Sequence, residues 1–176
     1  AGILPWFFVA DTLVICGTSI RGNRHLVTKS VFPAATIPTF VELSFFVTHL
    51  MLLAIATVIF AVCGFMGWHF VQILYGLVCL FVMMWVISIL FSALVAVSRD
   101  FEFLLKSATQ MLFWISPILW RIDSVKNYPF IYYVARLNPI GYVIEVYRSA
   151  FLGGWFFTDA AGTLCFWIEM VVLALL

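Results

Sequence analysis

The sequence has few charged residues. Only 10% of its 176 residues are Asp, Glu, Lys or Arg, whereas these four types make up about 25% of an ordinary soluble domain. Because the net charge is +1, the chain has no global field that would attract nucleic acid or another polyanion. Hydrophobic residues account for 65% of the chain, and the mean hydropathy is +1.16. This composition predicts an integral membrane protein.

Motifs for catalysis and nucleotide binding are also missing. The chain has no Gly-x-x-x-x-Gly-Lys phosphate loop, no His-Glu-x-x-His and no Gly-x-Ser-x-Gly. Its four cysteines lie in apolar runs without the spacing of a metal site, so we expect buried thiols, no metal site and no cofactor in this chain. We therefore expect no catalytic site, with a membrane-embedded glycosyl- or acyltransferase as the alternative.

Long apolar runs predict the membrane spans. Leu43 to Ser98 contains no charged residue, which is enough for two crossings of about 20 residues each. The stretch "GFMGWH", Gly64 to His69, divides this run, and its Trp favours the headgroup layer. We expect spans near residues 2–20, 38–63, 70–98, 104–120 and 160–176. The fourth has only a short charge-free part and is re-entrant in the alternative interpretation.

The placement of Lys and Arg predicts the orientation. Arg21–Ser30 and Ser98–Phe103 lie on one side of the predicted spans and carry four basic residues, whereas the Gly64–His69 turn carries none. By the positive-inside rule, the two basic loops face the cytoplasm. We therefore expect a multi-pass protein of the cell membrane, with residues 121–159 outside.

The outer segment has the pattern of two short helices. Asn138 can cap a helix that begins at Pro139 and ends at Gly153 and Gly154. Apolar residues recur on one face of this helix, with Glu145 and Arg148 opposite. Since it is too short to span, we expect residues 121–154 to form a re-entrant hairpin that is protected by protein.

Three segments together carry a family resemblance: "NRHLVTKSVFPAATIP", "SRDFEFLLKSATQMLFWISPILW" and "LNPIGYVIEVYRSAFLGG". Their order and spacing are similar to the membrane subunits of type 2 ABC exporters that move lipid-linked polysaccharides, including O-antigen and wall teichoic acid permeases. The resemblance implies an all-α, six-span fold in a single transmembrane domain, with a cytoplasmic coupling helix at residues 23–32 and the outer re-entrant hairpin. It also implies that the N-terminal part and the end of the last span are missing here.

The resemblance further implies partners and cargo. The permease would work as a homodimer with two copies of a separate ABC ATPase, which binds ATP and Mg²⁺. The cargo would be a lipid-linked polysaccharide, with wall teichoic acid favoured over O-antigen because Trp120 follows "SPIL". A drug or lipid exporter of the same fold is the competing class. The coupling helix would contact the ATPase through Asn23, Arg24, His25, Leu26, Thr28 and Lys29, unless this stretch is only a solvated basic loop that sets the topology.

Other candidate residues follow from the resemblance and from side-chain chemistry. Arg99 and Asp100 would lie at the inner mouth, where a guanidinium suits phosphate oxygens, or would only form a local ion pair. An outer gate is implied for Ser116, Pro117, Asn138, Pro139, Glu145, Tyr147 and Arg148. A sugar conduit would be lined by Trp6, Phe7, Phe8, Asp11, Trp85, Trp114 and Trp120, unless the aromatics only face the interface or lipid and Asp11 makes a structural hydrogen bond.

Overall fold

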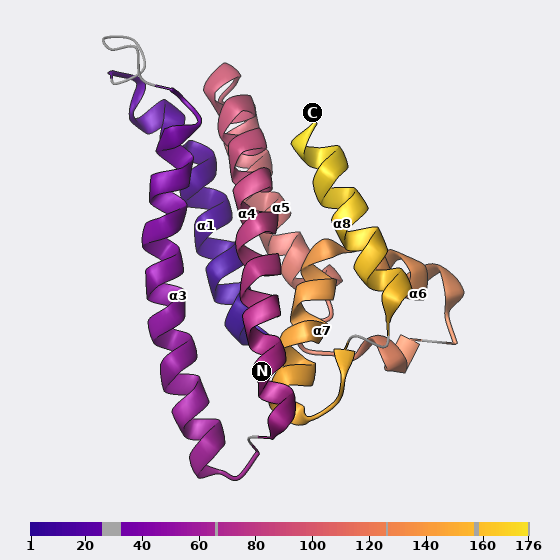
Figure 1. The fold of residues 1–176 in the computed structure, drawn as a ribbon. Coiled ribbons are helices and arrows are strands. Elements are labelled where there is room, and N and C mark those ends of the chain that lie inside the picture. The colour runs from indigo at the N-terminus through magenta and orange to yellow at the C-terminus, as the bar shows by residue number, and fades with distance from the viewer. Residues whose placement is uncertain (26–32, 66, 126, 157–158, 176) are drawn as a thin grey trace.

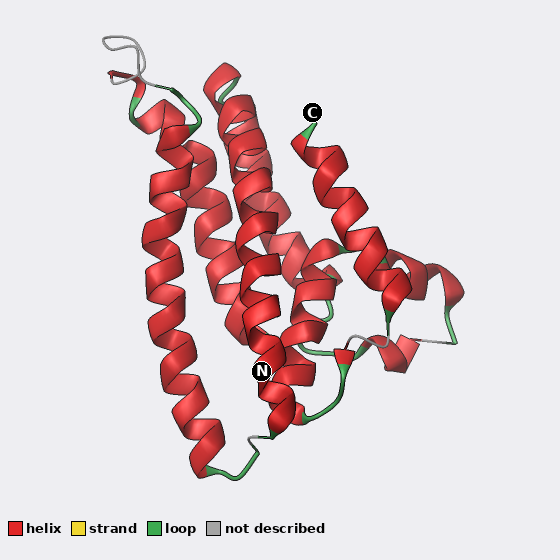
Figure 2. Ribbon diagram, in the orientation of Figure 1, coloured by secondary structure: helices red, strands yellow, loops and turns green. Residues whose placement is uncertain are grey.

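The computed structural model describes residues 1–25, 33–65, 67–125, 127–156 and 159–175 (Figure 1). All regular secondary structure in these residues is helical (Figure 2), which confirms the all-α fold class. The elements are α1 (Ile3–Gly22), α3 (Thr36–Val62), η1 (Trp68–Val71), α4 (Gln72–Val97), α5 (Asp100–Ile115), η2 (Ile122–Val125), α6 (Pro129–Arg136), α7 (Pro139–Leu152) and α8 (Ala160–Ala174).

Three helices are long and apolar enough to cross a membrane. They are α1, α3 and the continuous stretch Trp68–Val97, which joins η1 to α4. The predicted spans at residues 2–20, 38–63 and 70–98 coincide with these three helices. At about 1.5 Å per residue, each covers the roughly 30 Å hydrocarbon core of a bilayer.

α1 and α4 form the centre of the bundle, because they pack against each other and both contact α3, α5 and α7. Cys16 and Val9 on α1 are almost completely buried, as are Leu80 and Met83 on α4. Gly17 allows α5 to approach α1 closely, since a Cβ at this position would overlap the side chain of Leu105. The core therefore lies along α1 and α4, and much of α3 is left exposed.

The predicted span at residues 104–120 differs from the structure. The helix α5 ends at Ile115, and Ser116 is already extended, with ψ at 145°. Pro117 explains this end, because proline disfavours helical geometry in the residue before it and removes a backbone N–H donor. With 16 residues, α5 is about 24 Å long and shorter than the bilayer core. The chain then turns back through η2 and α6.

The helix that was expected to begin at Pro139 is confirmed as α7. The Oδ1 atom of Asn138 accepts a hydrogen bond of 3.0 Å from the backbone N–H of Ile140, which caps the helix. Gly153 ends it with a φ of +82°, a left-handed backbone that favours glycine. Ten of the 14 residues of α7 are buried, so this short helix belongs to the core.

A single side chain joins the start of α4 to the loop after α7. The side-chain amide of Gln72 donates a 2.8 Å hydrogen bond to the carbonyl of Gly154, and its carbonyl accepts one of 2.7 Å from the N–H of Phe156. Gln72 is buried. The loop is therefore fixed to the same end of α4 that α7 contacts.

The two ends of the bundle differ in what they contain. α1 and α4 finish at one end, where α5 begins, whereas α7 lies towards the opposite end, near the start of α1 (Figure 1). α8 runs beside α4 from the α7 end towards the other (Figure 1). We call the end where α1 and α4 finish the arginine end, after Arg21, Arg24 and Arg99, and the opposite one the latch end, after the contacts of Arg148.

Candidate functional site

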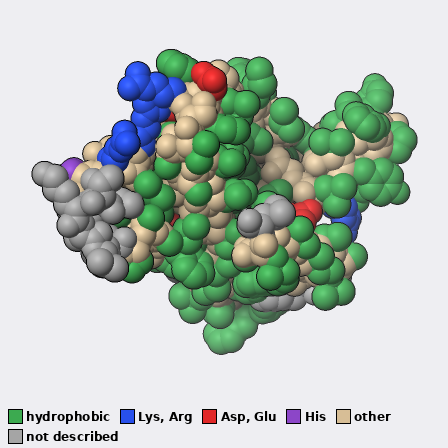
Figure 3. All heavy atoms as spheres, turned by 90° about the horizontal axis from the view of Figure 1, so that it is seen from above, with side chains coloured by type: hydrophobic (Ala, Val, Ile, Leu, Met, Phe, Trp, Pro, Cys, Tyr) green, Lys and Arg blue, Asp and Glu red, His purple; other side chains and the backbone are tan. Residues whose placement is uncertain are grey.

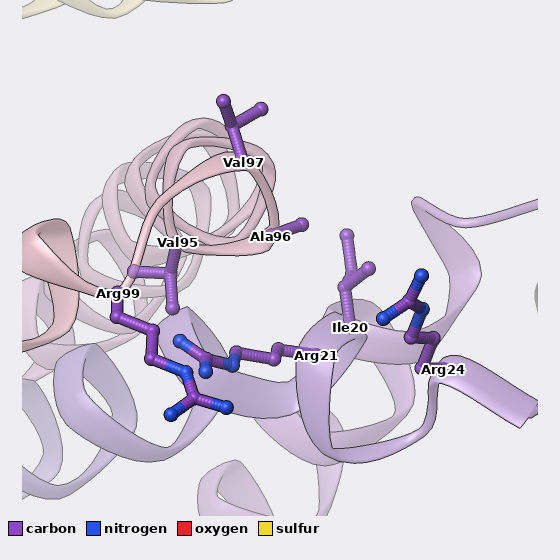
Figure 4. Close-up of a pocket in the computed structure, with 7 residues that line it drawn as sticks. All are labelled: Ile20, Arg21, Arg24, Val95, Ala96, Val97 and Arg99. Carbon is purple, nitrogen blue, oxygen red and sulfur yellow. The ribbon is translucent and has the colours of Figure 1, made fainter.

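A cavity of about 510 Å³ opens at the arginine end (Figure 4). Three arginines surround it, and the other lining residues are apolar. We call it the arginine cavity; it is lined by Ile20, Arg21, Arg24, Val95, Ala96, Val97 and Arg99. Seen from this end, Lys and Arg side chains gather at one edge of a mostly hydrophobic surface (Figure 3).

The ends of the helices bring these arginines together. Arg21 lies in the last turn of α1, and Arg24 follows shortly after it. α4 ends at Val97, Ser98 is extended, and Arg99 directly precedes α5. Arg21 and Arg24 thus carry positive charge at the C-terminal end of α1, where the helix dipole favours cations. Arg99 was predicted to lie at the inner mouth, whereas nothing in the sequence indicated that Arg21 lies beside it.

Acidic side chains on α5 balance only part of this charge. Arg21 lies 3.8 Å from Glu102, which also accepts a 2.8 Å hydrogen bond from Lys106. That hydrogen bond from Lys106 is the main cause that lowers the pKa of Glu102. Among the described residues, Arg99 lies within 4.0 Å of no carboxylate, but its charge is one of the causes that lower the pKa of Glu102. The cavity therefore keeps a positive surface that suits phosphate oxygens.

The predicted ATPase-contacting residues are only partly described. Arg24 and His25 are exposed at the arginine end. Asn23 instead ends α1, because its side-chain amide and its backbone N–H both donate to the carbonyl of Ser19, each at 3.0 Å. Leu26, Thr28 and Lys29 lie outside the described residues, as does most of the predicted coupling helix.

At the opposite end, one buried arginine joins α7 to the turn after α5. Arg148 is only 9% exposed. Its guanidinium donates hydrogen bonds to the carbonyls of Pro117 at 2.9 Å, Ile118 at 3.3 Å and Trp120 at 3.3 Å, and it pairs with Glu145. We call this arrangement the latch. It provides donors for backbone carbonyls of the turn after α5, which lie outside any helix.

Most of the predicted outer-gate residues meet at the latch, but one does not. Asn138 donates a 2.9 Å hydrogen bond to the hydroxyl of Ser116, which ties the start of α7 to the same turn. Pro139 occupies the first position of α7. Tyr147 is separate: it is completely buried, and its hydroxyl lies 2.9 Å from Nε2 of His49 on α3. It joins α7 to α3 within the core.

Two of the predicted conduit residues lie in the core. Trp6 packs against Phe113, with 5.5 Å between the ring centroids, and Phe8 packs against His49 at 5.4 Å. Both side chains are buried, although Phe8 also borders a cavity between α1 and α3. The physical reason is the direction in which α1 presents them, towards α5 and α3.

The other predicted conduit residues reach the surface to different extents. Phe7 is 51% exposed and, with the exposed Asp11, lines a cavity of about 330 Å³ between α1 and α3. Trp114 is 67% exposed. Trp85 donates a 3.0 Å hydrogen bond to the hydroxyl of Thr39, and Trp120 is half-buried beside the latch. The structure thus brings Phe7, Phe8 and Asp11 together at this cavity and leaves the tryptophans apart from them.

The chain is a multi-pass protein of the cell membrane, because three of its helices are long and apolar enough to span a bilayer. The chain belongs to the ABC-2 type transporter family, whose sequence model matches residues 1–152. This confirms the resemblance to type 2 ABC permeases.

Curated relatives point to the same family. The chain is similar to the O-antigen export system permease protein RfbA of Myxococcus xanthus, with 23% identity over 153 residues, or 85% of this chain and 58% of that protein. It is also similar to two proteins of the same name from Klebsiella pneumoniae, with 23% identity over 158 and 160 residues, or 87% of this chain and 59% of each. The chain thus spans just under three fifths of the length of these relatives.

Proposed function

We propose that the chain is the membrane-spanning permease subunit of an ATP-driven exporter that moves lipid-linked polysaccharide out of the cytoplasm. Membership of the ABC-2 family supports this proposal, and its curated relatives carry the names of O-antigen export permeases. The structural observation that carries it is that the arginine cavity lies at the end of α1, whereas the latch lies beside Gly2 at its start. An exporter requires such distinct inner and outer ends.

In this proposal the arginine end faces the cytoplasm, as the positive-inside rule requires. Residues 23–32 form the coupling helix that contacts a separate ABC ATPase, which binds ATP and Mg²⁺. α5, α6 and α7 belong to a six-span fold in which the segment of residues 121–154 is re-entrant. Two permease chains and two ATPase chains then transmit nucleotide hydrolysis to the spans by rigid-body tilting.

The homodimer and the conduit are supported by Asp11. This acid is exposed halfway along α1, between the exposed side chains of Phe7 and Ile15. A charge that faced lipid there would cost about 2.5–3.5 kcal/mol. We therefore place this face of α1 towards a second copy and a polar path between the copies, through which the glycan passes.

The cargo is defined by its lipid diphosphate, for which Arg99 supplies a guanidinium at the inner mouth. Two polymers fit this description. The position of Trp120 favours wall teichoic acid, whereas the curated relatives export O-antigen. An assay with both polymers therefore decides the cargo.

The export activity is tested in proteoliposomes that contain the permease and its ATPase. We expect ATP turnover to rise with undecaprenyl-linked polymer and not with hydrophobic dyes. Stimulation by dyes alone would make the protein a drug exporter of the same family. Sugar or acyl transfer by the permease without any ATPase would make it a transferase.

The contact with the ATPase is tested by reversing two charges. Arg24→Glu with Lys29→Glu should abolish co-purification of the ATPase while the spans stay folded, because the reversed charges repel the partner surface that the cations contact. Arg121→Glu, which changes an exposed arginine at the opposite end, is the matched control and should leave the complex intact. Unchanged co-purification in the double variant would contradict the assigned role of residues 23–32.

A further inference from the structure

One acidic side chain is buried between the spanning helices without a partner. Glu42, on α3, is completely buried, and neither of its carboxyl oxygens has a hydrogen-bond partner among the described residues. It belongs to none of the ion pairs in this part of the chain. Because α3 begins at Thr36, Glu42 lies about 9 Å along this helix from the arginine end.

α1 brings a hydroxyl without a partner to the level of Glu42. Phe8 on α1 packs against Phe46 on α3, with 5.8 Å between the ring centroids. The two helices run in opposite directions (Figure 1). One turn along α1 from Phe8 to Thr12, and one turn back along α3 from Phe46 to Glu42, therefore lead to the same level. Thr12 is completely buried, and its hydroxyl has no hydrogen-bond partner in the described part of the chain.

α4 completes the surroundings of Glu42. The buried thiol of Cys16, one turn beyond Thr12 on α1, lies close to Glu42 and beside the hydroxyl of Ser88 on α4. Ser88 is also completely buried, and its hydroxyl makes no hydrogen bond within the described residues. We call Thr12, Cys16, Glu42 and Ser88 the buried polar cluster.

We propose that the buried polar cluster is a proton-binding site, in which Glu42 holds one proton while α1, α3 and α4 are packed together. An ionised carboxylate at this position would be buried inside the membrane without a cation or a hydrogen-bond donor, which is a costly arrangement. A proton taken from water forms an O–H bond with the carboxylate and removes the charge. Separation of the helices admits water, and the proton returns to it. The inference goes beyond the proposed function and does not depend on polysaccharide export.

A proton fits the buried polar cluster better than a metal cation does. A hard cation takes about six oxygen ligands. The cluster supplies the two carboxyl oxygens of Glu42 and the hydroxyls of Thr12 and Ser88. The neighbouring backbone carbonyls belong to helices, where they already accept hydrogen bonds. A proton needs no such shell of ligands.

Few titratable groups surround Glu42 on the helices that pack against it. α1 presents the thiol of Cys16, whereas Asp11 is exposed at the cavity between α1 and α3. On α4 the nearest titratable side chain is Cys79, more than two turns from the cluster. On α3 itself, His49 lies two turns away and takes part in another hydrogen bond. Glu42 is therefore the member of the cluster whose charge a proton controls.

The bound proton is tested by infrared spectroscopy of the purified protein in neutral phosphatidylcholine nanodiscs. At neutral pH, the spectrum of the unmodified protein minus that of Glu42→Gln should show the C=O stretching band of a protonated carboxyl group. Glu102→Gln is the matched control, because Glu102 pairs with Arg21 and Lys106, and it should leave this band intact. A difference spectrum without the band, or loss of the band when Na⁺ replaces choline in the buffer, would overturn the assignment.

A second measurement follows thermal unfolding in a mild detergent at several pH values. The unfolded chain loses the proton of Glu42 near the ordinary pKa of a glutamate, about 4.3, whereas the packed bundle keeps it. Above that pH the folded state binds more protons, so its stability falls as the pH rises. From about pH 5 to pH 7, the Tm of the unmodified protein should therefore fall relative to that of Glu42→Gln, with up to about a tenfold change in the unfolding equilibrium per pH unit.

Glu42→Asp separates proton binding from a purely structural role. This variant changes the packing but keeps a carboxyl group, so its Tm should retain the pH dependence that Glu42→Gln loses. The same dependence of Tm on pH in the unmodified protein and in Glu42→Gln would overturn the inference, as would its loss in Glu42→Asp.

Discussion

Replacement of Arg148 by Met should destabilise the protein more than any other single loss of charge at the latch end. The guanidinium is buried and serves three carbonyls together with Glu145. The variant removes the donor of these three hydrogen bonds and the ion pair with Glu145. Removal of one partner from a buried pair costs about 3–5 kcal/mol. For a chain of this size, each kcal/mol lowers Tm by roughly 2–4 °C, so we expect a fall of about 6–20 °C.

The assay is thermal unfolding in a mild detergent, with matched scan rates for all variants. Arg136→Met is the control, because Arg136 also pairs with a carboxylate, that of Asp159, but both side chains are 36% exposed. An exposed pair contributes about 0–1 kcal/mol, so its loss should lower Tm by less than about 4 °C. Arg148→Lys keeps the charge without the fork of donors and should fall between the two. Equal Tm values for Arg148→Met and Arg136→Met would refute the role of the latch in stability.

Three further predictions concern the core and the arginine end. Gly17→Ala should lower the free energy of unfolding by about 1–3 kcal/mol, because the added methyl group overlaps the side chain of Leu105. The double variant Gly17→Ala with Leu105→Ala should lose less stability than the sum of the losses in the two single variants. Tyr147→Phe should lower the unfolding free energy by about 1–3 kcal/mol because His49 loses its buried partner; an unchanged Tm would show that the contact contributes nothing. Glu102→Gln removes the carboxylate that pairs with both Arg21 and Lys106, so inorganic diphosphate should bind more tightly at the arginine cavity. Weaker binding would contradict the electrostatic account of the cavity.

Some of the fold could be predicted because it depends on composition and on local chemistry. The charge-free run from Leu43 to Ser98 predicts two long helices, α3 and α4, and this prediction does not depend on how the helices pack. Asn138 and Gly153 mark the limits of α7 through a side-chain cap and a left-handed backbone, both of which depend on neighbours in sequence.

The rest depends on contacts between distant residues. α1 is apolar on nearly every side, so no stripe in the sequence indicates that Trp6 and Phe8 face inwards while Phe7 faces outwards. The basic residues after α1 are visible in the sequence. That Arg21 and Arg99 line the same cavity depends on the short turn between α4 and α5, which the sequence does not orient. Pro117 is a local signal for the early end of α5, because proline disfavours helical geometry in the residue before it, whereas the hydrophobicity of residues 107–120 favours a longer helix.

The hydrogen bonds between Gln72 and the loop after α7 couple the position of that loop to the orientation of α4. One end of this helix contributes to the arginine cavity, and the other holds the backbone of Gly154 and Phe156. Its 26 residues form a rod about 39 Å long, so a tilt of about 5° displaces one end relative to the other by roughly 3 Å. A shift of that size equals the length of a hydrogen bond. A small rotation of α4 at the arginine cavity therefore moves the loop after α7 by a comparable distance.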